Sequence, residues 1–175
     1  MLPGRYEQGL TLIELMIALA VAAILLLWGA PSMRSLFADA RAKAKIHALY
    51  HDLTQARHLA LSYQAMVTLC PVSTSNQCDG NWGEGYQVFI DALPLQTLDS
   101  DDLVMFSRTG IDSQDHLKYS ATVNAIRFDP EGFTGQNGSF YYCSDQPLVS
   151  HPVKVVISRT GRVKLEEHDG STSCQ

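Results

Sequence analysis

The stretch that decides the fold is Gly9-Leu10-Thr11-Leu12-Ile13-Glu14-Leu15, which opens an apolar run that continues to Ala30. Glu14 is the single charged residue in that run. A run of roughly 20 residues is long enough to cross a bilayer core as a helix. Because a lone carboxylate at that depth is costly unless it has a partner, an intramembrane charge indicates a functional site. We therefore favour a functional role for Glu14 over an ordinary signal anchor with a stray glutamate near the interface.

At the N-terminus a short leader ends in Gly9, the apolar Leu10 follows, and residues 11–14 read Thr-Leu-Ile-Glu. This pattern resembles the signature of type IV prepilins. The resemblance implies that a membrane-embedded aspartyl prepilin peptidase cuts between Gly9 and Leu10 and N-methylates Leu10. Most family members begin the mature chain with Phe, so Leu10 departs from the pattern but keeps its apolar character. In a pilus, the Glu14 carboxylate would be drawn to the positive N-terminal amine of an adjacent subunit, and this pairing would fix the register between subunits.

The length of 175 residues favours one domain plus the N-terminal helix. The formal net charge is −5, and removal of the leader, residues 1–9, leaves it unchanged because this segment carries Arg5 and Glu7. The leader lacks the apolar middle of a cleavable secretory signal, since the hydrophobic part follows the expected cut. An acidic balance argues against bulk binding of nucleic acid, although it leaves room for a local basic patch.

Four cysteines follow the apolar run: Cys70, Cys78, Cys143 and Cys174. An even number on the exported side predicts two disulfides formed in an oxidising compartment. We favour Cys70–Cys78, which closes a short turn-rich loop, together with Cys143–Cys174, which ties down the C-terminal tail. The spacings are not those of paired zinc ligands, so a zinc site is the weaker alternative.

Residues 31–64 are predicted to continue the helix beyond the membrane as an amphipathic segment. Pro31 is expected to kink it, because proline removes a backbone donor and its ring clashes with the preceding turn. Apolar residues then recur at steps of three and four and form one stripe: Ile46, Leu49, Tyr50, Leu53, Ala56 and Ala60. The charged residues lie mostly off this stripe: Lys43, Lys45, Asp52 and Arg57. One helix should therefore span the membrane, or the core of a pilus, with residues 10–30 and pack its second half on a globular domain.

Residues 65–175 are predicted to form a globular, β-rich domain. The apolar period changes there from helical to strand-like, and segments rich in Gly, Asn and Ser separate the strands. The predicted strands are residues 66–70, 86–91, 103–106, 124–128 and 139–143, followed by a hairpin of 153–158 and 162–167. One helix followed by a run of strands is the α+β pattern. We expect a pilin-like fold in which the long N-terminal helix packs on an antiparallel β-sheet domain.

Several short stretches of this part stand in a fairly specific order. They are residues 56–60, 67–70, Trp82 with 85–91, 126–128, Gly132, 140–143, and 155–158 with Gly161 and Arg162. In this order they resemble the GspH/FimT group of pilin-like proteins, which includes minor pilins and the type II secretion pseudopilin H. Together with the N-terminus, the resemblance covers nearly the whole mature chain.

Arg159, Arg162 and Lys164, with Lys154 nearby, form the only basic cluster in the sequence after the helix. Some FimT-like proteins of naturally competent bacteria bind DNA through a Gly-Arg-x-Arg motif, and the matching stretch here is Gly161-Arg162-Val163-Lys164. Lysine contacts phosphate without the bidentate geometry of arginine. The alternative is an ordinary polar outer face, offset by the acidic residues that follow: Glu166, Glu167 and Asp169.

Other candidate sites are weaker. His47 and His51 are four apart on the helix and His58 follows, but no carboxylate motif accompanies them, so solvated histidines are favoured over a metal site. The acidic residues between Asp91 and Asp102 lack the Gly and Glu spacing of an EF-hand. Trp82 is expected to be a core aromatic beside a tight turn. The sequence contains no nucleophile–base pair, phosphate loop or metal motif, so we expect neither an enzyme nor a metal or other cofactor.

The favoured hypothesis is a minor type IV pilin that supports pilus assembly. It would be held in the inner membrane by a single pass, with its C-terminal domain in the periplasm, and added to the priming complex at the pilus tip. Its partners would be the prepilin peptidase and other minor and major pilins. One alternative is a FimT-like pilin that binds DNA for uptake in natural transformation, and another is the type II secretion pseudopilin H.

Overall fold

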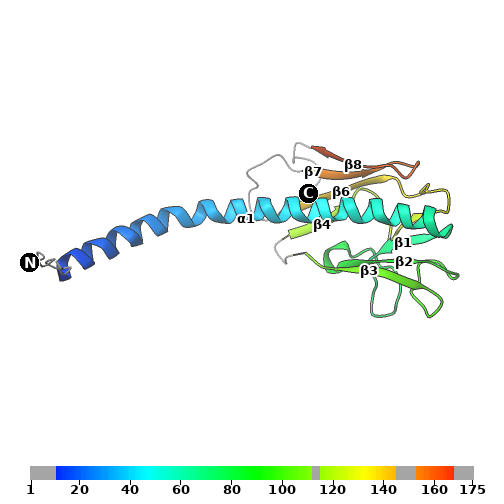
Figure 1. The fold of residues 1–175 in the computed structure, drawn as a ribbon, viewed down its shortest axis with the longest axis horizontal. Helices are drawn as coiled ribbons and strands as arrows, with labels where there is room; N and C mark the ends of the chain where they lie inside the picture. Colours follow the sequence, from blue (N-terminus) through cyan, green and yellow to red (C-terminus); the bar gives the residue numbers. More distant parts are fainter. Residues whose placement is uncertain (1–10, 112–114, 145–152, 168–175) are drawn as a thin grey trace, which may run out of the picture.

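The computed structural model describes residues 11–111, 115–144 and 153–167. Of residues 27–32 and 144 it describes the backbone only. Its dominant element is α1 (Leu12–Tyr63), a single helix of 52 residues. Figure 1 shows the N-terminal half of α1 projecting from the molecule and its C-terminal half lying along the strands. The predicted single long helix, packed on an antiparallel β domain, is therefore confirmed.

Both ends of α1 carry local termination signals. Thr11 has an extended backbone, and its side chain accepts a hydrogen bond from the Glu14 backbone N–H at 3.3 Å, as an N-cap does. At the other end Gln64 adopts the left-handed conformation with φ 51° and donates its backbone N–H to the carbonyl of Ala60. Between them the helical backbone continues through position 31. The Pro31 side chain lies outside the described ones, so the expected kink stays a prediction.

The strands form two antiparallel sheets. In the first the order is β3-β2-β1-β5, and these strands are β3 (Leu103–Thr109), β2 (Gly85–Ile90), β1 (Val67–Cys70) and β5 (Ile126–Phe128). In the second the order is β4-β6-β7-β8, and these strands are β4 (Asp115–Tyr119), β6 (Gly138–Ser144), β7 (Val153–Ile157) and β8 (Val163–Glu167). A short 3₁₀ turn, η1 (Trp82–Glu84), precedes β2.

The sequence predicts every one of these strands except β4. The segment Asp115–Tyr119 mixes two partly buried apolar residues, Leu117 and Tyr119, with charged and polar neighbours, and this pattern is too short to indicate a strand by itself. The strand forms because each of its five residues pairs with β6, from Asp115 opposite Ser144 to Tyr119 opposite Phe140. The local sequence pattern does not reveal a strand whose stability comes from pairing with another strand.

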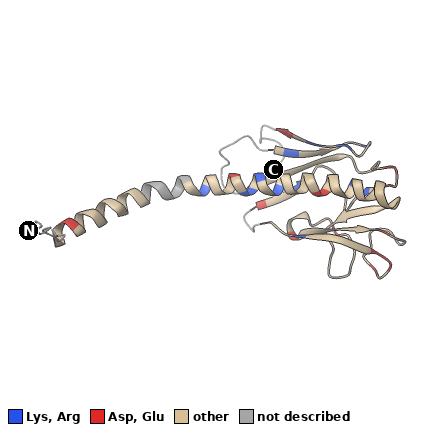
Figure 2. Cartoon of the chain, viewed as in Figure 1, with Lys and Arg blue, Asp and Glu red and all other residues tan. Residues whose placement is uncertain are grey.

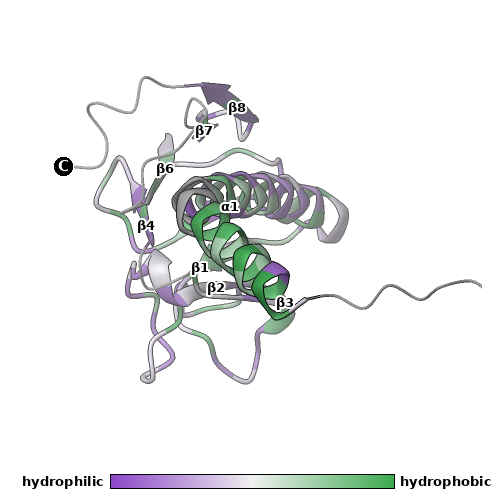
Figure 3. Cartoon of the chain, turned by 90° about the vertical axis from the view of Figure 1, so that its left-hand side faces the viewer, coloured by the Kyte–Doolittle hydropathy of each residue, from purple (hydrophilic) through white to green (hydrophobic). Residues whose placement is uncertain are grey.

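The hydrophobic core lies where the stripe of α1 meets both sheets. Leu53, Ala56 and Ala60 are completely buried, and Ile46 and Leu49 nearly so. The stripe packs on residues of both sheets: Val67, Leu69, Val88, Ile126 and Phe128 from the first, and Phe140, Val155 and Ile157 from the second. In the end-on view of Figure 3, β7 and β8 lie on one side of α1 and β1, β2 and β3 on the other. The helix is therefore a central layer of the domain.

A smaller cluster surrounds the predicted Cys70–Cys78 disulfide, which is present and joins Cα atoms 5.6 Å apart. Both cysteines are buried beside Phe89 and Ala125. The bridge closes the loop between β1 and η1. Cys143 lies on β6, and its expected partner Cys174 lies outside the described residues, so the second bridge stays a prediction.

Peptide mapping of the unreduced protein tests both bridges. We expect one linked pair containing Cys70 and Cys78 and another containing Cys143 and Cys174. Replacing Cys143 and Cys174 together by alanine should lower the free energy of unfolding by about 2–5 kcal/mol, since an unfolded chain without the cross-link has more conformational freedom. A peptide joining Cys143 to Cys70 or Cys78 would contradict this layout.

Candidate functional site

The N-terminal half of α1 carries apolar side chains that the described residues leave uncovered. Those from Leu12 to Leu26 are between 51% and 78% exposed: Leu12, Ile13, Leu15, Met16, Ile17, Leu19, Val21, Ile24, Leu25 and Leu26. Figure 3 shows this half mostly in the green of hydrophobic residues, and Figure 1 shows it projecting beyond the strands. A contiguous apolar surface of this kind marks an interface with protein or lipid. Within the part of the chain that the structure describes, no helical segment combines the length and the apolar character needed to cross a membrane.

Glu14 lies in the first turn of this apolar half. Residues 12–26 contain no other charged residue, and Figure 2 shows this half of α1 mostly in the tan of uncharged residues. The Glu14 side chain is exposed, and a carboxylate there is favourably placed against the positive N-terminal end of the helix dipole. Once the surrounding apolar surface is buried, this charge requires a cation as partner. Gly9 and Leu10 lie outside the described residues, so cleavage and methylation stay predictions.

Buried charges fasten the C-terminal half of α1 to the first sheet. Asp52 is 1% exposed and accepts a hydrogen bond from the Tyr86 hydroxyl at 2.7 Å. Arg108 of β3 donates to both oxygens of the same carboxylate, from Nε at 2.7 Å and from Nη2 at 2.8 Å. Burial raises the pKa of Tyr86, and the bond to Asp52 raises it further. That carboxylate also raises the pKa of Arg108. We call these three residues the Asp52 clamp.

A second cluster fastens α1 to the other sheet with the charges exchanged. Here the helix supplies the cation, Arg41, whose Nε lies 3.3 Å from Oδ2 of Asp115 on β4. The Tyr142 hydroxyl of β6 donates to the same oxygen at 2.6 Å. Burial raises the pKa of Tyr142, and its hydrogen bond to Asp115 adds to this. Arg41, Asp115 and Tyr142 form the Asp115 clamp, and together the two clamps join α1 to both sheets.

The prediction for Asp52 was wrong, because it was expected to lie off the apolar stripe. Asp52 follows Leu49 by three residues and precedes Ala56 by four, so its spacing places it on the stripe. This was the available signal, since a carboxylate on a buried face requires a cation as partner. The identities of Arg108 and Tyr86 could not be read from the sequence, because both come from strands far along the chain.

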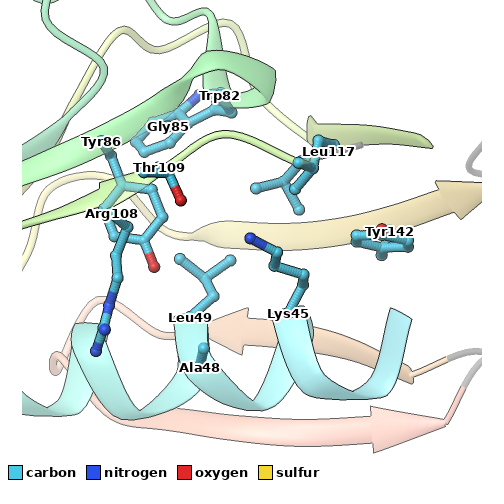
Figure 4. Close-up of a pocket in the computed structure, with 11 residues that line it drawn as sticks. Lys45, Ala48, Leu49, Trp82, Gly85, Tyr86, Arg108, Thr109, Leu117 and Tyr142 are labelled. Carbon is cyan, nitrogen blue, oxygen red and sulfur yellow. The ribbon is translucent and has the colours of Figure 1, made fainter. Parts of the chain in front are cut away.

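A cavity of about 220 Å³ lies between the two clamps (Figure 4). Tyr86 and Arg108 of one clamp and Tyr142 of the other line it, together with Lys45 from α1. Trp82 also lines the cavity and makes an edge-on contact with Phe140, with ring centroids 4.8 Å apart. The prediction that Trp82 is a core aromatic beside a turn is therefore confirmed.

The basic residues of the expected DNA site lie around the turn between β7 and β8. Arg159 and Arg162 are exposed, and Arg159 Nε donates to Asn137 Oδ1 at 3.1 Å. Lys164 is paired with Glu166, which also accepts Lys154 at 3.5 Å. The hydrogen bond from Lys164 lowers the pKa of Glu166. The structure thus places Arg159 and Arg162 at the turn. The neighbouring lysines, Lys154 and Lys164, both form ion pairs with Glu166.

Gly161 holds this turn against the end of α1. Its φ is +72°, and an added Cβ would lie 1.9 Å from the Gly132 carbonyl oxygen, which accepts a hydrogen bond from Arg57 Nε at 3.0 Å. Only glycine fits such an approach. Gly161 therefore has a structural reason that is independent of any ligand.

The remaining candidates have local structural roles. Asp102 accepts backbone N–H bonds from Ala92 and Asp99, and Asp91 accepts from Thr68 and Gln96. Burial raises the pKa of Asp91. His47 and His51 are exposed. Among the described residues, no three His, Cys, Asp or Glu side chains are grouped as metal ligands.

Two family patterns match the chain. The one described as type II transport protein GspH matches residues 45–161, and the prokaryotic N-terminal methylation motif matches residues 4–30. Among solved structures, the type IV minor pilin FimU of Pseudomonas aeruginosa is similar with a TM-score of 0.54 and 19% identity, over 71% of this chain and 87% of that one. The minor pseudopilin EpsH of the Vibrio cholerae type 2 secretion system is similar with a TM-score of 0.52 and 11% identity, over 73% and 97%. No curated protein matches significantly.

The Asp52 clamp predicts a large effect of one substitution at the protein surface. Arg108→Gln leaves the Asp52 carboxylate buried without its cation, so the free energy of unfolding should fall by about 1–3 kcal/mol in urea titrations. The lower part of this range allows for the Arg108 side chain being 51% exposed.

Lys43→Gln is the matched control, because the Lys43 side chain is half-exposed and pairs with Asp39 one turn away on the same helix. Its effect should stay within about 0.5 kcal/mol. Adding Asp52→Asn to Arg108→Gln should recover part of the lost stability. If Arg108→Gln proves as silent as Lys43→Gln, the clamp does not stabilise the domain.

Proposed function

This chain belongs to the GspH family of pilin-like structural proteins, and from that premise we propose that it is a minor type IV pilin of the pilus tip. In this role it joins the priming complex and supports pilus assembly. The family is structural rather than enzymatic. The matched methylation motif implies processing by a prepilin peptidase and contacts with other pilins.

The observation that carries the proposal is the uncovered apolar half of α1 with one carboxylate at its start. Burial of so many apolar side chains is strongly favourable, whether the surroundings are lipid or neighbouring helices. Before assembly, lipid would cover these apolar side chains, and the helix would anchor the protein in the inner membrane. After assembly, the helices of other pilins would cover them.

Glu14 would fix the position of this helix along the neighbouring helices. An apolar helix can slide along its neighbours at little cost, because their side chains are alike. A buried carboxylate is stable only beside a cation, and the free amine made by cleavage before Leu10 is a cation at the same level of an adjacent helix. We infer that this pair sets the register of the incoming subunit.

The domain fits an exported location on the far side of the membrane. A disulfide between Cys70 and Cys78 is expected to persist in an oxidising compartment such as the periplasm. The same features suit a pseudopilin of type II secretion, a class to which EpsH belongs by name. The uncovered helix, the clamps and the disulfide are compatible with a type IV pilus and with a type II secretion pseudopilus. The two roles are distinguished by which of these filaments contains the chain.

The processing step predicts a specific mature terminus. Protein isolated from its native host should give an intact mass and an N-terminal sequence that begin at N-methylated Leu10, because cleavage is expected after Gly9. A mature chain that still begins at Met1 would contradict the proposal that it is a pilin.

Glu14→Ala separates processing from assembly. The variant should be cleaved normally but should reduce the number of pili on cells, since the incoming helix loses its charge partner. Glu14→Asp is the matched control and should restore part of the assembly. Normal pilus numbers with Glu14→Ala would remove the register role, while the processing result would stand.

DNA binding at the β7–β8 turn is the second candidate, favoured by the exposed Arg159 and Arg162. It is weakened because Glu166 already pairs with Lys164 and Lys154. Contacts would be to phosphates, so binding should be independent of sequence and should weaken with salt. The few cations available predict a shallow salt dependence.

Gel-shift assays with duplex DNA and the full chain in uncharged detergent test this candidate. We expect at most a weak shift at low ionic strength, and Arg162→Gln with Lys164→Gln should abolish it. Lys43→Gln should leave it unchanged. No shift at low salt would eliminate the DNA role, and a shift that survives the double substitution would assign it to another surface.

A further inference from the structure

The cavity between the clamps has the size of one substituted ring. Its volume is about 220 Å³, and an engineered cavity of about 150 Å³ in another protein is enough to bind benzene. Figure 4 shows it open between α1 and the strands, with Lys45 reaching up from the helix and Trp82 on the opposite side. Such a space in a small domain is large enough for a ligand to occupy.

The walls of the cavity are mainly apolar. Leu49, Trp82, Ile111 and Leu117 line it, together with the ring of Tyr142. These side chains belong to the hydrophobic core or pack against it, so contacts with the surrounding core residues fix their positions. A ring placed among them would exchange water for apolar contacts, which is the usual character of a small-molecule site.

The shape of the cavity is set by rigid contacts. An added Cβ on Gly85 would lie 2.3 Å from the Arg108 carbonyl oxygen, and one on Gly110 would lie 2.6 Å from that of Gly83. These glycines allow η1, β2 and the end of β3 to pack closely on one side. The Asp52 and Asp115 clamps fix α1 on the other. The cavity is therefore preorganised, which reduces the cost of binding.

The charge around the cavity is positive. Lys45 Nζ donates to a neutral acceptor, the Gly110 carbonyl oxygen at 3.1 Å, and none of the ion pairs found among the described residues includes it. The Asp52 and Asp115 carboxylates are already engaged by Arg108 and Arg41. An anion beside Lys45 would gain a charge-assisted hydrogen bond in place of a neutral one.

We propose that this cavity binds a small free organic acid with a ring-sized apolar body, of which phenylacetate is the simplest example. The ring lies between Leu49, Trp82 and Leu117, and the carboxylate takes the place of the Gly110 carbonyl as acceptor from Lys45. The volume suits a ring with a short acid arm and leaves little room for a peptide backbone as well. This binding is independent of the pilus role, because the residues belong to the domain and not to the uncovered half of α1.

Titration calorimetry with the full chain in uncharged detergent tests the proposal, with phenylacetate and its neutral analogue phenylacetamide as probes. A ligand of this size should bind with a Kd of about 1 mM at low ionic strength. The amide should bind about fivefold more weakly or worse, since it lacks the charge that Lys45 recognises. Equal affinities for acid and amide, or no heat from the acid, would overturn the proposal.

Two substitutions locate the binding. Lys45→Gln should remove the preference for the acid over the amide, whereas Lys43→Gln, whose side chain pairs with Asp39, should keep it. Ala48→Leu adds volume from the helix side of the cavity and should abolish binding of both probes. Unchanged preference in Lys45→Gln would contradict the site, even if Ala48→Leu failed to fold.

N-acetylphenylalanine distinguishes a free acid from a chain end. It presents the same ring and carboxylate on a peptide-like group, as the last residue of a neighbouring subunit would. We expect it to bind more weakly than phenylacetate, because the cavity lacks room for the amide. Tighter binding of N-acetylphenylalanine would overturn the proposed ligand and identify a protein terminus instead.

Discussion

The structure depends on the burial of one stripe of α1 between two sheets. Leu53, Ala56 and Ala60 are completely buried there, and both sheets place core residues against them. Both four-stranded sheets pack their core residues on this helix, so the helix is needed for the core of the domain. The helix α1 is continuous over 52 residues, about 78 Å, and Glu14 lies in its first turn. The contacts that hold its C-terminal half in the domain therefore also fix the position of Glu14 relative to the domain.

The buried charges add specificity to that apolar contact. A stripe that repeats every three or four residues would still present apolar side chains to the sheets after a shift of one turn. The Asp52 clamp and the Asp115 clamp permit one position only, since a shift would leave Asp52 and Asp115 buried without their cations. Their opposite polarity also distinguishes the sheets, because the helix offers an acid to the first and a base to the second. We infer that the clamps select the register, while apolar burial supplies most of the stability.

Features with a local signal could be predicted from the sequence, and features that depend on distant partners could not. The long helix, the hairpin of β7 and β8 and the Cys70–Cys78 bridge follow from apolar period, turn residues and short cysteine spacing. Strand β4 escaped prediction because its stability comes from pairing with β6. The division into two sheets and the partners of Asp52 likewise arise from tertiary contacts. Of the site, Glu14 could be recognised because a charge in an apolar run is a local anomaly.

The central claim is that the uncovered half of α1 is buried among the helices of a type IV pilus. Quantitative mass spectrometry of filaments sheared from the native host tests this most directly, with the tryptic peptide of residues 46–57 as the reporter of the domain. The account predicts this peptide in purified pili at a small fraction of the major pilin and its loss from a strain without pili. Its absence from pili, with the chain retained in the envelope beside the secretion apparatus, would contradict the account.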